Sequence, residues 1–164
     1  MASGTLLCAF DAQAAQPHPS NSATPDTRNG LLVLDFDAAA IEAVCFVGRL
    51  PPNYGGGGLT IKLRWMASTA VSGSVRWQLS IERHQRGVDD TDLNSFVASA
   101  MVTTAAVSPC GTEMETLISL TAGAAMDNLQ IGERFRLYVF RVATDAGDDM
   151  AGDAELVQLD IYET

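Results

Sequence analysis

Residues 59–84 read LTIKLRWMASTAVSGSVRWQLSIERH and contain two runs in which apolar and polar residues alternate. Every second side chain is apolar in residues 59–67, and residues 74–84 repeat the pattern. A period of two is typical of a β-strand that buries one of its faces. The intervening turn ends at Gly73, so we expect two consecutive strands that are antiparallel or nearly so.

Six further runs of similar length and composition predict strands and bring the total to eight. They cover residues 31–36, 43–49, 96–104, 115–120, 134–143 and 154–163. Turn-forming residues separate the runs, and no long helix is indicated. The sequence therefore predicts an all-β fold, an eight-stranded jelly-roll-like β-sandwich that covers residues 31–164.

Residues 1–30 are predicted to form an extended N-terminal arm outside the sandwich. Residues 11–30 contain three prolines and no hydrophobic period, so they cannot bury enough surface to offset their chain entropy. In front of them, Leu6, Leu7 and Phe10 provide a short apolar anchor. We expect the arm to become ordered on a neighbouring subunit; the alternative is a disordered tail without a role.

The charge balance limits the kinds of partner. Twenty acidic and ten basic residues give a formal net charge of −10, and Lys62 is the only lysine. Phosphate backbones and anionic membranes attract clustered basic residues, so neither nucleic acid nor a membrane is an expected partner. Cys8, Cys45 and Cys110 share no CxxC spacing, which predicts free thiols in a reducing compartment. A signal peptide and a membrane span are not expected either.

Few residues could carry catalysis or hold a cofactor. The only histidines are His18 and His84, whereas a cupin metal site gathers two or more histidines with a carboxylate. A nucleophilic triad needs a base oriented by a third group. The acidic stretches 89–92 and 145–153 have oxygen ligands that suit Ca²⁺ but lack EF-hand spacing, so Ca²⁺ binding there is left open. We predict that the protein is not an enzyme and has no catalytic residues, cofactor or metal site.

The strand predicted at residues 134–143 is apolar on both faces. If Phe135 and its alternate neighbours enter the core, Tyr138 and Phe140 are left outside. An exposed apolar patch usually marks a partner surface. The alternative is that the chain's own arm or a loop covers these two rings. The predicted interface residues are Leu6, Leu7, Phe10, Phe46, Tyr138 and Phe140.

Three segments resemble small structural proteins of tailed bacteriophages: residues 46–65 (FVGRLPPNYGGGGLTIKLRW), 74–83 (SVRWQLSIER) and 147–164 (GDDMAGDAELVQLDIYET). The resemblance spans roughly residues 43–164. Similar jelly-roll proteins act as decoration or cement proteins that clamp capsid subunits together. The resemblance implies a homotrimer, bound to the major capsid protein or to other virion proteins. It also implies that the protein is made in the host cytoplasm and carried in the virion.

A tail or fibre module that binds glycans or a receptor is the alternative function. Sandwiches and jelly rolls also serve as lectins, and sugar sites favour exposed aromatic side chains. Both tryptophans fall on predicted core faces, which favours the capsid role over glycan binding. A hydrolase or metal enzyme lacks residues in a suitable combination.

Overall fold

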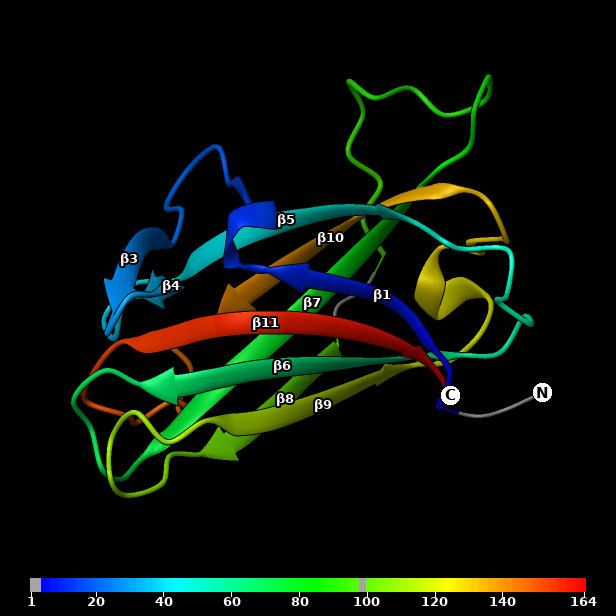
Figure 1. The fold of residues 1–164 in the computed structure, drawn as a ribbon. Helices are drawn as coiled ribbons and strands as arrows, with labels where there is room; N and C mark the ends of the chain where they lie inside the picture. The colour runs from blue at the N-terminus through cyan, green and yellow to red at the C-terminus, as the bar shows by residue number, and fades with distance from the viewer. Residues whose placement is uncertain (1–3, 98–99) are drawn as a thin grey trace.

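The computed structural model describes residues 4–97 and 100–164, which fold into two antiparallel sheets packed face to face (Figure 1). Sheet A has the strand order β3-β4-β11-β6-β9, with β1 also paired to β11, and sheet B has the order β2-β5-β10-β7-β8. The all-β sandwich expected from the sequence is confirmed. The strands are β1 (Leu6–Asp11), β2 (Gln16–Pro17), β3 (Thr24–Arg28), β4 (Leu31–Phe36), β5 (Glu42–Arg49), β6 (Leu59–Ala67), β7 (Ser74–His84), β8 (Ala100–Ala105), β9 (Met114–Leu120), β10 (Arg134–Arg141) and β11 (Ala154–Glu163).

Two single turns of 3-10 helix, Ala12–Ala14 and Ala124–Met126, complete the secondary structure of the described residues. The eight predicted strands correspond to β4 to β11, with shifts of a few residues at their ends. None of the helices in the described part of the chain is long and apolar enough to cross a membrane.

The strands that decided the fold, β6 and β7, do not pair with each other. Strand β6 lies in sheet A between β11 and β9, and β7 lies in sheet B between β10 and β8. The turn between them, with Gly73 at a φ of 93°, therefore crosses from one sheet to the other. Alternation with period two identifies a buried face, but it does not say which strand pairs with which.

The N-terminal segment belongs to the sandwich, which corrects the predicted boundary at residue 30. Strand β1 pairs with β11, β2 pairs with β5, and β3 pairs with β4. The ring of Phe10 packs on Phe46 with centroids 5.5 Å apart. Pro17 and Pro25 are accommodated because β2 and β3 are edge strands, where a missing N–H leaves no ladder bond unmade. Strands β2 and β3 contain few apolar residues, so composition alone did not indicate them. The apolar run of β1 was recognised but was interpreted as an anchor for a neighbouring subunit.

The core lies between the sheets and is centred on aromatic side chains. Trp77 of sheet B packs against Phe36 and Trp65 of sheet A, with ring centroids 5.1 and 5.8 Å apart. The Trp65 indole N–H donates to the Thr116 hydroxyl over 2.9 Å, so this buried polar atom has a partner. Burial of such large rings is the main stabilising contribution in a sandwich of this size.

One charged residue, Arg141 of β10, is buried among these apolar side chains. Its Nε and Nη2 donate to the two carboxylate oxygens of Asp148 over 3.0 and 2.8 Å. The remaining N–H groups donate to the carbonyl oxygens of Phe36, Met150 and Gly152 over 3.1, 2.9 and 2.7 Å. All five donors of the guanidinium are therefore satisfied, and the side chain joins β10 to β4 and to the loop before β11.

The buried ion pair leads to the first prediction, which concerns stability. Replacing Arg141 with Leu leaves the buried Asp148 carboxylate without a counter-charge and three carbonyl groups without donors. We expect the free energy of unfolding, measured by urea denaturation, to fall by about 3–5 kcal/mol. The matched control is Arg64→Leu, because the Arg64 side chain is 44% exposed and its ion pair with Glu115 spans 3.8 Å. That change should cost no more than about 1 kcal/mol; equal losses for both variants would contradict the role assigned to Arg141.

Candidate binding face on sheet B

The outer face of sheet B carries a row of side chains that changes from cationic to aromatic along β10. Phe135, Leu137 and Val139 face the core and are fully buried. Their alternate neighbours face outward, in the order Arg134, Arg136, Tyr138 and Phe140. Strands β5 and β7 flank β10 on its two sides, so this row runs along the middle of the sheet (Figure 1).

The aromatic end of the row is a cluster of four rings. Tyr138 stacks on Phe96 with centroids 4.3 Å apart and contacts Phe140 edge to face at 5.8 Å. The His18 ring lies 5.0 Å from Tyr138 and 6.1 Å from Phe140. All four side chains are half-buried. Burial raises the pKa of the Tyr138 hydroxyl above its usual range.

Glu82 of β7 fastens the loop that carries Phe96 to the sheet. Its side chain is 1% exposed and accepts hydrogen bonds from the backbone N–H and the hydroxyl of Ser95. Arg136 donates to the same carboxylate through its Nε over 2.7 Å, and His84 Nε2 lies 3.2 Å away. Burial pushes the pKa of Glu82 upward, but the bonds from Ser95 and Arg136 outweigh it, so the pKa is lowered. The carboxylate is thus ionised near neutral pH and holds the loop in place.

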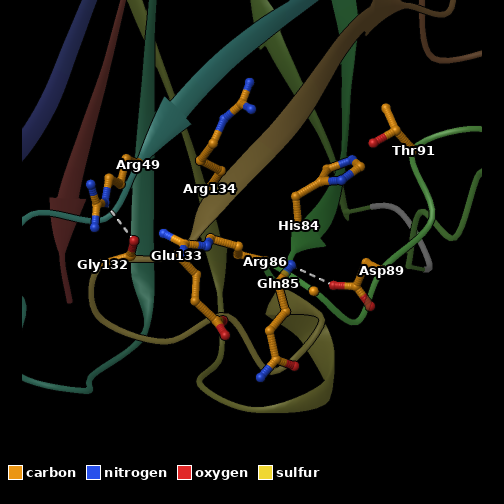
Figure 2. A pocket seen from close by; sticks show the side chains of 10 residues that line it. Arg49, His84, Gln85, Arg86, Asp89, Thr91, Gly132, Glu133 and Arg134 are labelled. Carbon is orange, nitrogen blue, oxygen red and sulfur yellow. Dashed lines mark hydrogen bonds between the residues drawn. The ribbon is translucent and has the colours of Figure 1, made fainter.

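The cationic end of the row opens into a cleft of about 440 Å³. We call it the arginine cleft. Arg49, Arg134 and His84 occupy one register position across the adjacent strands β5, β10 and β7, and Arg86 comes from the turn after β7. Figure 2 shows these side chains around the hollow, with His84 and Thr91 on the same side of it. The complete lining is Arg49, His84, Gln85, Arg86, Gly87, Asp89, Thr91, Gly132, Glu133 and Arg134.

A second hollow of about 230 Å³ adjoins the arginine cleft. The two share His84, Thr91 and Arg134, and the second also reaches Arg136. The concave surface therefore extends from the arginine cleft along β10 toward the aromatic cluster. A concave surface with several convergent polar groups is the usual form of a ligand site.

The structure brings together only part of the predicted interface. Tyr138 and Phe140 lie on the outer face as expected, and the chain's own His18 and Phe96 partly cover them. Phe46 is 1% exposed and faces the core, which corrects its assignment to a partner surface: on β5 it shares the buried face with Val44. Leu7 and Phe10 are half-buried against the core, whereas Leu6 is exposed.

The acidic loops have structural partners. In residues 145–153, Asp148 binds Arg141, and Asp149 accepts a hydrogen bond from the Ser74 backbone N–H over 2.6 Å. In residues 89–92, Asp89 accepts from the Gln85 backbone N–H. Within residues 4–97 and 100–164, no group of three or more His, Cys, Asp or Glu side chains is arranged to hold a metal ion. These carboxylates therefore satisfy backbone donors and one buried guanidinium.

The lowered pKa of Glu82 gives the second prediction. A carboxylate with a lowered pKa in the folded state stabilises the fold above its unfolded pKa of about 4.3, and the contribution is lost as the pH falls through the folded value. Replacing Glu82 with Gln should therefore lower the free energy of unfolding by roughly 1–3 kcal/mol at pH 7. The difference should shrink below about pH 4, in urea denaturation series measured at each pH.

Hydrogen exchange of the loop that carries Ser95 and Phe96 supplies an independent measurement. In Glu82→Gln the backbone N–H of Ser95 should exchange with solvent deuterium faster at pH 7 than in the unmodified protein. The control Glu115→Gln removes a carboxylate that is 34% exposed and should alter neither readout by much. A loss of stability that was the same at pH 7 and pH 4 would show that the charge of Glu82 is not what holds the loop.

No protein-family model matches the chain, and no curated protein matches it in sequence. Among solved structures, a cycloisomaltooligosaccharide glucanotransferase from Paenibacillus sp. is similar, with 14% identity and a TM-score of 0.52 over 93% of this chain and 18% of that enzyme. A carbohydrate-binding module from Cellvibrio mixtus lichenase 5A aligns with 12% identity and a TM-score of 0.47 over 98% and 99% of the two chains. The family 11 carbohydrate-binding module from Clostridium thermocellum aligns with 11% identity and a TM-score of 0.47 over 100% and 98%. This chain spans 18% of the glucanotransferase's length, and at 14% identity the likeness shows the fold alone.

Proposed function

We propose that the protein is a non-catalytic glycan-binding module whose ligand lies along β10 on the outer face of sheet B. The observation that carries the proposal is the row Arg134, Arg136, Tyr138 and Phe140, which ends in a concave surface. Sugars present an apolar face of C–H groups and a rim of hydroxyls, so their sites combine aromatic side chains with hydrogen-bonding groups. The row on β10 has aromatic side chains and hydrogen-bonding groups on one strand.

Polar side chains flank the rings, and one of them, Ser80, already donates its hydroxyl to the Val97 carbonyl over 3.3 Å. Gln78 and Ser80 of β7 lie opposite Phe140 and Tyr138 in the register. Asn94, in the loop over the sheet, accepts a hydrogen bond from Arg136 over 3.1 Å. Amide, hydroxyl and guanidinium groups can donate to or accept from sugar hydroxyls. The face therefore offers directional contacts beside its apolar ones.

The same contacts support the proposal that the module is not an enzyme. His84 is the only histidine of the arginine cleft, and its Nε2 faces Glu82, which Arg136 and Ser95 also bind. The imidazole thus completes a network that fixes the loop over sheet B. A general base would instead have to face a nucleophile or a substrate proton.

The likeness of the fold to a domain of an enzyme solved with bound cycloisomaltoheptaose is consistent with glycan binding, but a fold hosts many functions. The proposal rests on the surface of sheet B. A location on the tail or fibre of a phage particle, where surface glycans are recognised, agrees with both the resemblance and this surface. The decoration role, the trimer and the capsid partner were expected from the resemblance and from the exposed apolar strand surface, and they stay predictions.

The third prediction tests the site with two tyrosines on opposite faces of the sandwich. Tyr138 lies on the outer face of sheet B, and Tyr162 lies in sheet A, where the Lys62 ammonium sits 4.8 Å from its ring centre. On a glycan array followed by calorimetric titration of the bound glycan, Tyr138→Ala should weaken binding about tenfold or more, because its ring contact is worth roughly 1.5 kcal/mol. Tyr162→Ala should leave binding unchanged.

Thermal melting of both variants shows whether each is folded at the temperature of the titration. A folded Tyr138→Ala variant that binds as tightly as the unmodified protein would contradict the proposed site. Loss of binding in Tyr162→Ala alone would move the site to sheet A.

A further inference from the structure

We infer that the glycan carries a negatively charged group, a carboxylate or a sulfate ester, and that the arginine cleft binds this group. The inference rests on the proposed function and names the class of glycan. It starts from the distribution of charge. Three of the ten basic residues of a chain with a net charge of −10 line this one cleft.

The arginines of the cleft are not neutralised by the protein itself. Within residues 4–97 and 100–164, no carboxylate forms an ion pair with Arg49, Arg86 or Arg134. Arg49 donates its Nε to the Gly132 carbonyl over 2.5 Å, which places the guanidinium but adds no negative charge. Like charges gathered in a hollow repel one another, and a bound anion would reverse that effect.

The two acidic residues of the cleft are occupied elsewhere. Asp89 accepts a hydrogen bond from the Gln85 backbone N–H, and its Oδ2 lies 3.5 Å from Arg83 Nε. Glu133 accepts from the Gln130 backbone N–H over 2.9 Å. These hydrogen bonds hold the carboxylates in the turns around the cleft but leave their charges in place. Three arginines against two carboxylates give the lining a net charge of +1 (3 − 2), and Arg83 also balances Asp89.

The donors suit an oxyanion in both chemistry and placement. A guanidinium presents a planar fork of N–H groups that matches the oxygens of a carboxylate or a sulfate. Arg49 and Arg134 occupy the same register position on neighbouring strands, which lie about 4.8 Å apart. The Thr91 hydroxyl lies beside the His84 ring at the side of the hollow (Figure 2) and adds a further hydrogen-bond donor.

The cleft is also within reach of a glycan that contacts the aromatic cluster. Arg134 precedes Tyr138 by four residues on the same strand, a separation of roughly 14 Å at 3.4 Å per residue. The adjoining hollow covers part of this distance, since its lining includes Arg136. A short oligosaccharide can therefore touch the rings with one unit and place an acidic group of another unit among the arginines.

The surroundings disfavour a long polyanion such as nucleic acid. Asp90 and Asp92 are exposed on the loop beside the cleft, and the remainder of the protein is strongly acidic. Such a field repels an extended phosphate backbone. A single charged group that enters a small basic hollow avoids most of this repulsion, so an acidic glycan fits better than a nucleic acid.

The test compares matched acidic and neutral glycans on one array. It carries uronic-acid, sialic-acid and sulfated oligosaccharides, each beside its methyl-esterified or desulfated counterpart, together with a twelve-residue thymidylate strand. We expect the acidic member of a pair to bind at least tenfold more tightly than its neutral counterpart, with affinity that falls as salt rises. Arg86→Gln and Arg134→Gln change exposed residues and should each weaken the acidic member about tenfold or more, and the neutral member little.

The control variant is Arg64→Gln, an exposed arginine on β6 of sheet A, which should change neither affinity. Equal binding of both members of every pair, unaffected by Arg86→Gln and Arg134→Gln but lost in Tyr138→Ala, would overturn the acidic-group inference while the proposed function stands. Binding of the thymidylate strand as tight as that of the best glycan would overturn the glycan class. If none of the glycans bound, acidic or neutral, the proposed function would fail with the inference.

Discussion

The buried guanidinium of Arg141 is the constraint on which the arrangement of the candidate binding face depends. It donates to Asp148 and to carbonyl oxygens at the end of β4 and before β11. These bonds are possible only when Arg141 faces the core. A slip of β10 by one residue would turn the buried charge outward and exchange the two faces of the strand. The ion pair therefore also fixes Arg134, Arg136 and Tyr138 on the outer side.

Much of the fold could be predicted from the sequence because a half-buried strand leaves a local pattern. The alternation in residues 59–67 and 74–84 identified two central strands and the faces that they bury. The strand predicted at residues 134–143 was recognised too, but it is apolar on both faces, so its buried face stayed conditional. The pairing of strands could not be predicted in this way, since β6 and β7 are consecutive but lie in different sheets. The N-terminal segment was misjudged for two reasons. Strands β2 and β3 contain few apolar residues, and the apolar run of β1 was interpreted as an anchor for another subunit.

The candidate site was predictable only where it is local. Tyr138 and Phe140 lie on one strand, and its period placed them on the outer face. The arginine cleft draws residues from β5, from the end of β7 with its following turn, and from β10, which become neighbours only through the sheet order β2-β5-β10-β7-β8. Arg49, His84 and Arg134 each stand at the end of a predicted strand, which was a local signal. The sequence pattern does not indicate that these strand ends lie side by side. The acidic loop 145–153 was left open as a Ca²⁺ ligand set, although Asp148 binds Arg141 only seven residues earlier in the chain. The local signal for that bond was an arginine on the same strand face as Phe135, Leu137 and Val139.

Sheet B carries the proposed binding face, and sheet A is its supporting layer. The most direct measurement is a map of amide chemical shifts in ¹⁵N-labelled protein during titration with the glycan that binds most tightly. The account predicts that the perturbed amides lie in β5, β7 and β10 and in the loop that carries Thr91 and Phe96, while those of β6, β9 and β11 stay unchanged. Perturbations confined to sheet A, or spread evenly over both sheets, would contradict it.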